Sequence, residues 1–258
     1  MTVQEAAERL AGASASGSPV APVRDLLGTT DLDAAYAVQQ ELTRRRLAGG
    51  AVVTGRKIGL TSPAVQAQLG VDQPDFGVLF ADMDVSALAE VPSERLLQPK
   101  AEAEIAFVLR ADVTDPARAR DAVAYAVAAL EIVDSRIADW DISLTDTVAD
   151  NASSGLYVLG GRRLTLDEFE PREADMRLYA GDVLVSEGSG AACLGDPLNA
   201  LEWLARTALA FGEPLRAGQV VLSGALGPMV PAPPGTRIRA EVGALGEVTA
   251  VFSEKRDA

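Results

Sequence analysis

LLQPKAEAEIAFVL, residues 96–109, is the stretch that determines how the centre of this chain folds. Its last five residues, 105–109, are continuously apolar, which predicts a strand buried on both faces. Glu102 and Glu104 lie two residues apart at the head of that strand, so their carboxylates project from the same face. Two neighbouring anions at the mouth of a buried strand repel each other. They form either an ordinary solvated strand end or one side of a cation site.

Glu131 favours the cation site. It stands between Leu130 and Ile132, at the expected end of a helix, and a charge in such an apolar stretch needs a partner when buried. One divalent cation would satisfy all three carboxylates, whose hard oxygens suit Mg²⁺ or Mn²⁺. The chain contains no histidine, which excludes Ser-His-Asp triads, Cys-His dyads and helical His-Glu-x-x-His zinc sites. We therefore predict a metal site formed by Glu102, Glu104 and Glu131.

The amino-acid composition restricts the cellular compartment and the binding partners that we expect for this protein. The chain of 258 residues has a single cysteine, Cys193, so it has no intrachain disulfide, as is typical of the reducing cytoplasm. Cys193 is expected to be a buried packing residue. The formal net charge of −14 disfavours nucleic acid and anionic membranes as partners. No signal peptide and no membrane-spanning stretch are expected, and we predict a cytoplasmic protein.

Residues 1–50 are expected to form an N-terminal helical segment. It has a short helix over 3–10, a loop or linker over 11–19 and a stronger helix over 33–47. Thr30 or Asp31 can cap the stronger helix, and the glycines at 49–50 can stop it. Residues 51–258 are expected to form one β-rich catalytic domain.

Short β-rich runs dominate the second part. We expect strands at 52–53, 77–80, 104–109, 156–159, 183–185, 220–222, 237–242 and 248–252. Helices are expected at 116–129 and 197–211, each with a proline in its first turn, and the Gly- and Pro-rich stretch 224–235 is interpreted as an ordered loop. The pattern predicts an α+β fold with a large mixed or antiparallel sheet.

Lys57 and Asp75 lie in glycine-containing segments. Glycines at 55 and 59 flank Lys57 and allow close backbone approach, whereas Asp75 stands in the turn-like sequence QPDFG at 73–77. Taken alone, Lys57 is typical of an exposed strand lysine and Asp75 of a turn residue. Spacing does not show whether the fold brings them to the glutamates.

A polar run, DTVADNASSG at 146–155, precedes the strand expected at 156–159. Small hydroxyls and an amide next to glycine can bind a carboxylate through side chains and backbone N–H groups. The same composition is equally typical of a capped loop.

Five collinear stretches resemble the 2-keto-4-pentenoate hydratase family of the fumarylacetoacetate hydrolase superfamily. They are GRKIGLTSPAVQAQLGVDQPDFGVLFADM (55–83), LLQPKAEAEIAFVL (96–109), ALEIVDSRIADWDISLTDTVADNASSGLYVLGG (129–161), GAACLGDPLNALEWLA (190–205) and VVLSGALGPMVP (220–231). The resemblance extends from about residue 30 to the end, and the first thirty residues match less distinctly.

The resemblance implies a β-rich roll or distorted barrel with an N-terminal helical appendage. It implies that Glu102, Glu104 and Glu131 bind Mg²⁺ or Mn²⁺. It also implies a homo-oligomer, either a pentamer or a decamer. The implied reaction is hydration of 2-hydroxypenta-2,4-dienoate, or a close homologue, to 4-hydroxy-2-oxopentanoate in aromatic meta-cleavage catabolism. Lys57 and Asp75 match the family's candidates for proton transfer and water positioning. Asn151, Ser153 and Ser154 are weaker candidates for substrate contacts.

Three alternatives are weighed against the hydratase. A 2-oxo-3-hexenedioate (4-oxalocrotonate) decarboxylase resembles the chain at the same metal positions. The sequences at 76–83 and 154–158, however, are more similar to those of the hydratases. An acylpyruvate-type hydrolase uses a histidine base, which this chain lacks. A non-catalytic oligomeric protein that retains the fold is disfavoured by the intact glutamates and Lys57.

Overall fold

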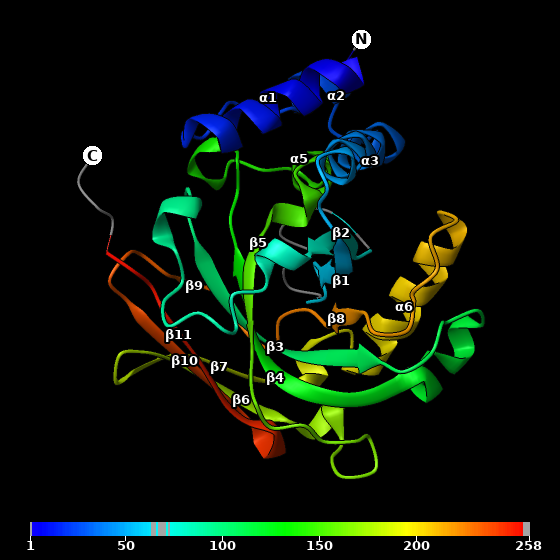
Figure 1. Cartoon of the computed structure of the whole chain (residues 1–258), viewed down its shortest axis with the longest axis vertical. Coiled ribbons are helices and arrows are strands. Elements are labelled where there is room, and N and C mark those ends of the chain that lie inside the picture. The colour runs from blue at the N-terminus through cyan, green and yellow to red at the C-terminus, as the bar shows by residue number, and fades with distance from the viewer. Residues whose placement is uncertain (1, 63–65, 67–70, 72, 255–258) are drawn as a thin grey trace.

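The computed structural model describes residues 2–62, 66, 71 and 73–254. Two sheets form a curled, β-rich body, and three N-terminal helices lie across one end of it (Figure 1). The larger sheet has the strand order β2-β1-β8-β3-β4-β5, with β9 paired to β3, and the smaller sheet has the order β11-β10-β6-β7. The helices are α1 (Thr2–Ser16), α2 (Arg24–Leu27), α3 (Leu32–Ala48), α5 (Leu144–Ala149) and α6 (Pro197–Ala210). The strands are β1 (Val53–Gly59), β2 (Asp75–Phe80), β3 (Lys100–Leu109), β4 (Val123–Val133), β5 (Ser154–Leu159), β6 (Asp175–Ala180), β7 (Val183–Ser189), β8 (Val220–Leu222), β9 (Val230–Pro231), β10 (Arg237–Val242) and β11 (Gly246–Val251).

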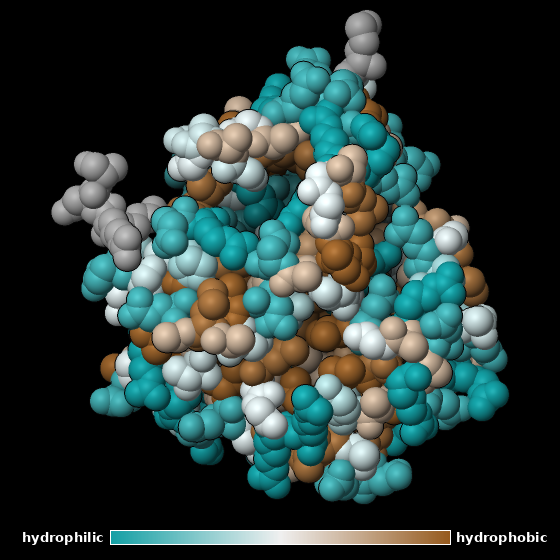
Figure 2. Space-filling view, in the orientation of Figure 1, coloured by the Kyte–Doolittle hydropathy of each residue, from teal (hydrophilic) through white to brown (hydrophobic). Residues whose placement is uncertain are grey.

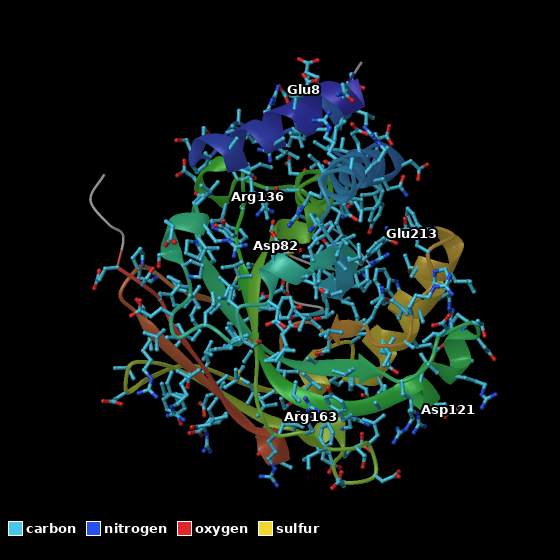
Figure 3. All side chains as sticks on the ribbon, in the orientation of Figure 1. Glu8, Asp82, Asp121, Arg136, Arg163 and Glu213 are labelled. Carbon is cyan, nitrogen blue, oxygen red and sulfur yellow. The ribbon has the colours of Figure 1, made fainter. Side chains whose placement is uncertain are left out.

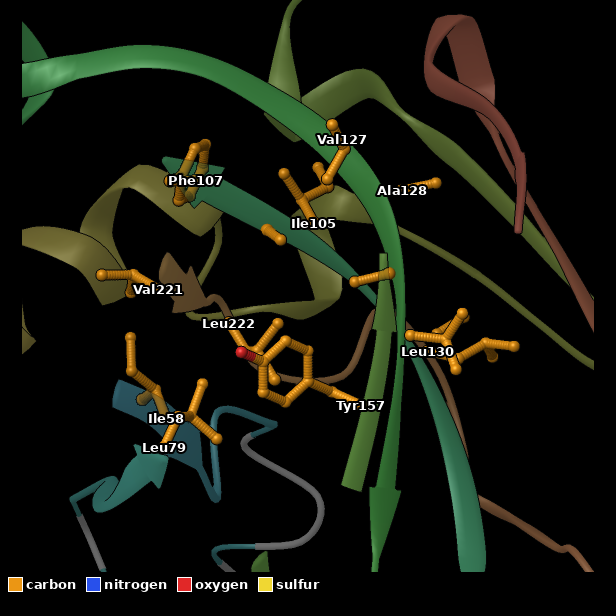
Figure 4. Close-up of a cluster of buried hydrophobic side chains, with 14 of the residues drawn as sticks. Ile58, Leu79, Ile105, Phe107, Val127, Ala128, Leu130, Tyr157, Val221 and Leu222 are labelled. Atoms are coloured by element: carbon orange, nitrogen blue, oxygen red, sulfur yellow. The ribbon is translucent and has the colours of Figure 1, made fainter. Parts of the chain in front are cut away.

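The antiparallel pair β3–β4 is the longest strand pair of the larger sheet. It runs in continuous register from Lys100 opposite Val133 to Val108 opposite Tyr125. Both strands are buried along most of their length, as the apolar run after Glu104 predicts. Figure 4 shows β4 curving around a cluster that includes Ile105, Leu130 and Tyr157. This curvature lets residues of β1, which is three places from β4 in the strand order, face residues of β4.

The helix expected over 116–129 is wrong. A 3₁₀ segment covers Pro116–Ala122, and the rest of the stretch is the first part of β4. Alanine favours a helix intrinsically, but Ala126, Ala128 and Ala129 are fully buried between neighbouring strands, where small side chains allow close packing. Glu131 therefore belongs to a strand and does not end a helix.

The N-terminal segment is more helical than expected. The helix expected over 3–10 continues to Ser16, so most of the loop expected over 11–19 is wrong. Ala13 is fully buried, and Gly17, at a φ of 68°, follows the helix end. The helix expected over 33–47 is confirmed as α3, and of its two cap candidates Asp31 accepts a hydrogen bond from the Ala34 N–H.

Several further expectations are confirmed or refined. α6 begins at Pro197, as its first-turn proline predicts, and Cys193 is buried. The stretch 224–235 is a loop interrupted by β9, and the polar run at 146–155 is not a plain loop, because it contains most of α5 and a 3₁₀ turn over Asn151–Ser153. None of the helices in the described part of the chain combines the length and hydropathy that a membrane crossing requires.

Asp146 joins the N-terminal helices to the β-rich body. Its buried carboxylate accepts hydrogen bonds from the backbone N–H groups of Val23, Arg24 and Ser143, and it pairs with the Arg24 guanidinium at 2.7 Å. The same guanidinium also pairs at 2.6 Å with Asp141, whose side chain is 65% exposed. One arginine therefore has a buried and an exposed partner.

This pair of partners gives a test of what fixes the helices. Asp146→Ala leaves several buried donors unpaired and should lower the free energy of unfolding by about 3 kcal/mol. Asp141→Ala removes an exposed ion pair and should cost less than about 1 kcal/mol. Urea denaturation followed by circular dichroism measures both variants. Equal losses of unfolding free energy in the two variants would show that the burial of Asp146 adds nothing to stability.

Candidate metal centre

Three glutamates converge between β3 and β4. Glu102 lies directly opposite Glu131 in the antiparallel register, so both side chains point to the same face of the sheet. Glu104 projects from that face two residues further along β3. One carboxylate oxygen from each residue lies within 4.8 Å of the other two. The structure thus brings together the three residues predicted as metal ligands.

Glu104 and Glu131 are buried, Glu102 is partly exposed, and the trio has few hydrogen-bond donors. Glu104 and Glu131 are 0% and 1% exposed. Glu104 Oε2 accepts a hydrogen bond of 2.9 Å from the Gly224 N–H, and Glu131 Oε1 lies 3.2 Å from Lys57 Nζ, but Glu104 Oε1 and Glu131 Oε2 have no donor among the described residues. Burial, reinforced by the neighbouring carboxylates, raises the pKa of Glu102 to about 7 and raises that of Glu104 well above its ordinary value. Burial also raises the pKa of Glu131, against the opposing effect of Lys57.

These observations fit a bound divalent cation. The three carboxylates, two of them buried, carry a charge of −3 when ionised, and burying an uncompensated charge is costly. The oxygens without donors point to a common centre and supply the hard ligand set that Mg²⁺ and Mn²⁺ prefer. An ordinary solvated strand end, the alternative left open by the sequence, does not agree with this burial.

Lys57 provides one compensating charge. It is 3% exposed on β1, and its Nζ lies 3.2 Å from Glu131 Oε1 and donates a hydrogen bond of 3.0 Å to the Ala152 carbonyl oxygen. Burial alone would lower the pKa of Lys57, but Glu131 and the other carboxylates nearby raise it above the ordinary lysine value. Lys57 is therefore a fixed ammonium group rather than an exposed strand lysine.

Asp75 reaches the same region from β2. It pairs with Gly59 across the β1–β2 ladder, and burial raises the pKa of its carboxyl group while Lys57 opposes that rise. A Cβ on Gly59 would lie 2.2 Å from Asp75 Oδ1 and 3.4 Å from Lys57 Nζ, so only glycine lets the two groups meet there. Asp75 Oδ1 accepts no hydrogen bond from any described residue. Asp75 is thus a buried strand residue, and the turn assignment is wrong.

A left-handed turn supports Lys57. Asn151, Ala152 and Ser153 have φ values of 55°, 53° and 51°, a conformation that residues other than glycine rarely adopt. The Asn151 amide fixes the turn to β2, because its Oδ1 accepts from the Val78 N–H and its Nδ2 donates to the Val78 carbonyl oxygen. The Ser154 hydroxyl donates to the Asn151 carbonyl oxygen. The turn thereby presents the Ala152 carbonyl oxygen to Lys57.

Ser153 is connected to Asp75 through Thr147. The Ser153 and Thr147 hydroxyl oxygens are 3.1 Å apart, and the Thr147 hydroxyl group hydrogen-bonds to the Asp75 carboxylate. Substrate contacts by Asn151, Ser153 and Ser154 stay a prediction, while their bonds in the structure hold the turn and Asp75.

Sequence reasoning missed Thr147, Gly59 and the Ala152 carbonyl group. Thr147 and Ala152 lie in the polar run noted at 146–155, but no sequence signal marks a backbone carbonyl or a positive φ at an alanine. Gly59 was noticed only as one of two flanking glycines. Its specific role depends on the β1–β2 register.

A separate cavity of about 550 Å³ lies between the N-terminal helices and the β-rich body. Figure 2 shows it as a hollow beneath α1. Its lining includes Arg136, Asp150, Asn151 and Ser154 but none of the three glutamates. It is therefore distinct from the metal centre.

The fold and the acidic site together define a class of enzyme. Residues 56–253 match the model of the fumarylacetoacetate (FAA) hydrolase C-terminal family, and the chain belongs to that family. Within it, the chain is 54% identical over 256 residues to a protein from Pseudomonas putida named TodF product hydratase, covering 98% of this chain and 96% of that protein. It is 52% identical to 2-keto-4-pentenoate hydratase 2 of Dechloromonas aromatica, with 98% of each covered.

A solved structure shows the same fold. The 4-oxalocrotonate decarboxylase of Pseudomonas putida, described as complexed with magnesium and adipate, superimposes with a TM-score of 0.92 at 33% identity, covering 97% of each chain. These findings confirm the resemblance identified from the sequence and the predicted β-rich fold with N-terminal helices.

Cation binding at this site should depend on pH in a defined direction. The carboxylates must lose protons to bind a metal, and because their pKa values are raised without one, protons compete near neutrality. With the pKa of Glu102 at about 7 and that of Glu104 also raised, Mg²⁺ affinity measured by calorimetry should rise at least about tenfold from pH 6 to pH 8, with release of protons. Glu104→Gln should abolish this binding, and an affinity independent of pH would contradict the assignment.

Proposed function

We propose that this chain hydrates 2-hydroxypenta-2,4-dienoate, or a close homologue, to 4-hydroxy-2-oxopentanoate in the meta-cleavage breakdown of aromatic compounds. The enzyme class is hydro-lyase, as the names of the relatives at 50–54% identity indicate. The observation that carries the proposal is the convergence of Glu102, Glu104 and Glu131 beside the ammonium group of Lys57.

Glu102, Glu104 and Glu131 would hold a divalent metal ion, and we propose Mg²⁺ or Mn²⁺. The burial of Glu104 and Glu131, and the oxygens of each that have no donor, support this ligand set, as does the magnesium in the decarboxylase structure. When bound, such an ion supplies a Lewis acid that stabilises negative charge on a substrate oxygen. The remaining chemistry is assigned to the side chains of this chain.

Lys57 is proposed to stay protonated throughout the reaction. An ammonium group has three N–H donors, and Glu131 and the Ala152 carbonyl oxygen occupy two of its directions. The third is available to the substrate or to Asp75. Lys57 would therefore orient the reacting groups and offset negative charge, whereas proton removal would fall to another residue.

Asp75 is proposed to transfer the protons. Its Oδ1 has no described donor, and it lies beside Lys57 above Gly59. In the first step, the proton of the 2-hydroxyl group leaves and C5 gains a proton, which gives an α,β-unsaturated 2-oxo acid. In the second step, the oxygen of water bonds to C4 and a proton reaches C3. A carboxyl group that alternates between its two protonation states serves both steps.

The alternatives have less support. The decarboxylase relative shares the fold at 33% identity, but the hydratases are at 50–54% identity over nearly the whole chain. The intact buried glutamates argue against a non-catalytic protein. The pentameric or decameric assembly and the cytoplasmic location remain predictions from the sequence.

An absorbance assay tests the proposal directly. Protein stripped with EDTA should leave 2-hydroxypenta-2,4-dienoate unchanged, and added Mg²⁺ or Mn²⁺ should restore loss of the dienol absorbance. Glu104→Gln should remove this activity while circular dichroism shows an intact fold. Release of CO₂ from the 2-oxo-3-hexenedioate diacid, with no turnover of monoacid dienols, would support the decarboxylase instead. If neither the monoacid dienol nor the diacid is turned over in the presence of metal, the alternative of a non-catalytic protein is supported.

Gly59→Ala tests the meeting of Lys57 and Asp75. The added methyl group would lie 2.2 Å from Asp75 Oδ1, so the carboxylate must move. A displacement of about 1 Å should lower kcat about 100-fold, with little change in Mg²⁺ affinity. Gly161→Ala is the matched control, because its Cβ would meet nothing within 4 Å. Wild-type kcat in Gly59→Ala would remove Asp75 from the chemistry.

A further inference from the structure

Lys100 lies on the same face of β3 as the metal ligands. It is the first residue of the strand, and Glu102 and Glu104 follow at alternate positions. Two strand residues span about 7 Å, so a lysine side chain at position 100 can reach the region in front of Glu102. Lys57 approaches the glutamates from a different strand, β1, through Glu131. Two cations therefore flank the trio.

An aromatic ring holds the Lys100 ammonium group. Its Nζ lies 4.2 Å from the centroid of Trp140, at the distance of a cation–π contact, and Lys100 has no ion pair with any described residue. Gln98 fixes the ring in turn. Its carbonyl oxygen accepts a hydrogen bond of 3.0 Å from Trp140 Nε1, and its side chain bonds to the Asp139 N–H and the Ile137 carbonyl oxygen. A cation held on a ring keeps its N–H donors free for a ligand.

The charges leave a place for one more cation. The three glutamates carry −3, Lys57 carries +1, and a divalent ion would bring these charges to zero, to which Asp75 adds −1 whenever it is ionised. A substrate carboxylate then adds a negative charge inside a protein whose formal net charge is already −14. Lys100 is placed to offset it.

We propose that Lys100, held on Trp140, binds the carboxylate next to the 2-oxygen of the substrate and so fixes which way round the substrate lies. The inference rests on the proposed function. The carboxylate end would lie at Lys100, and the reacting carbons would extend past the glutamates toward Lys57 and Asp75. Lys100 would thus determine the specificity for 2-oxo and 2-hydroxy acids, without taking part in proton transfer.

Binding of unreactive analogues tests this orientation. The chain has two tryptophans, so a Trp203→Phe background leaves Trp140 as the only fluorescent indole beside Lys100. With Mg²⁺ present, 2-oxopentanoate and the diacid 2-oxoadipate are titrated against this protein and its Lys100→Gln variant. Both analogues should bind about tenfold more weakly to Lys100→Gln, as expected for one lost charge-assisted contact. Lys100→Arg should restore most of the affinity, and calorimetry provides a second readout.

Arg163→Gln is the matched control. Arg163 also lies over an aromatic ring, 4.6 Å from the Tyr125 centroid, but near the other end of β4 from Val133, the residue opposite Lys100. Figure 3 shows Arg163 at the end of the molecule opposite the N-terminal helices. This variant should bind both analogues like the parent protein. Equal weakening by Arg163→Gln would make the effect one of net charge and overturn the proposal.

Other outcomes separate the inference from the function. Weakening of 2-oxoadipate alone would place the distal carboxylate at Lys100, and weakened Mg²⁺ binding without analogue would assign Lys100 to the metal ligands; either overturns the proposal. Unchanged analogue binding in Lys100→Gln, with normal hydration by the parent protein, defeats only the inference. Tenfold weaker binding in a protein that hydrates no dienoate supports the Lys100 contact and defeats the proposed function.

Discussion

Convergence of three carboxylates, two of them buried, at one point of the β3–β4 ladder is the constraint on which the rest of the site depends. Glu102 and Glu131 face each other across the ladder, and Glu104 follows on the same face. Such a cluster is unfavourable without positive charge, so the surrounding elements must supply it. β1 does so with Lys57, although β8 and β3 separate β1 from β4 in the strand order. The curl of the larger sheet therefore brings the positive charge of Lys57 next to Glu131. In a flat sheet the two side chains would lie apart.

Close backbone approach makes that curl possible. A Cβ at Gly55 would lie 1.9 Å from the Val220 carbonyl oxygen, so the parallel contact between β1 and β8 requires glycine there. The left-handed turn at Asn151–Ser153 adds a different constraint, at about 1–2 kcal/mol of unfavourable energy per residue. The Asn151 and Ser154 hydrogen bonds offset that strain, and the result is a carbonyl oxygen directed at Lys57. Strain of this kind is tolerated where function needs a fixed group.

The sequence predicts the parts of the site that depend on local periodicity. Alternation along 100–109 places Glu102 and Glu104 on one face without knowledge of the fold, and the absence of histidine narrows the chemistry. The unusual place of Glu131 in an apolar stretch predicts it as a ligand, although the helix expected before it is wrong. The alanines at 126, 128 and 129 favour a helix locally, and only burial between strands reverses that preference. Thr147 and the Ala152 carbonyl group were not predictable, because their roles come from contacts with β1 and β2.

An acidic protein that binds an anionic substrate needs positive charge at specific points rather than over its surface. Here the cations differ in how they are held. Lys57 is buried against a carboxylate and a carbonyl oxygen, which fixes it in place. Lys100 is only partly buried and is held by the face of Trp140, which restrains its position without using its N–H donors. The first arrangement suits a group that must keep its charge beside the reacting atoms. The second suits a group that must release one contact and form another each time a carboxylate enters and leaves.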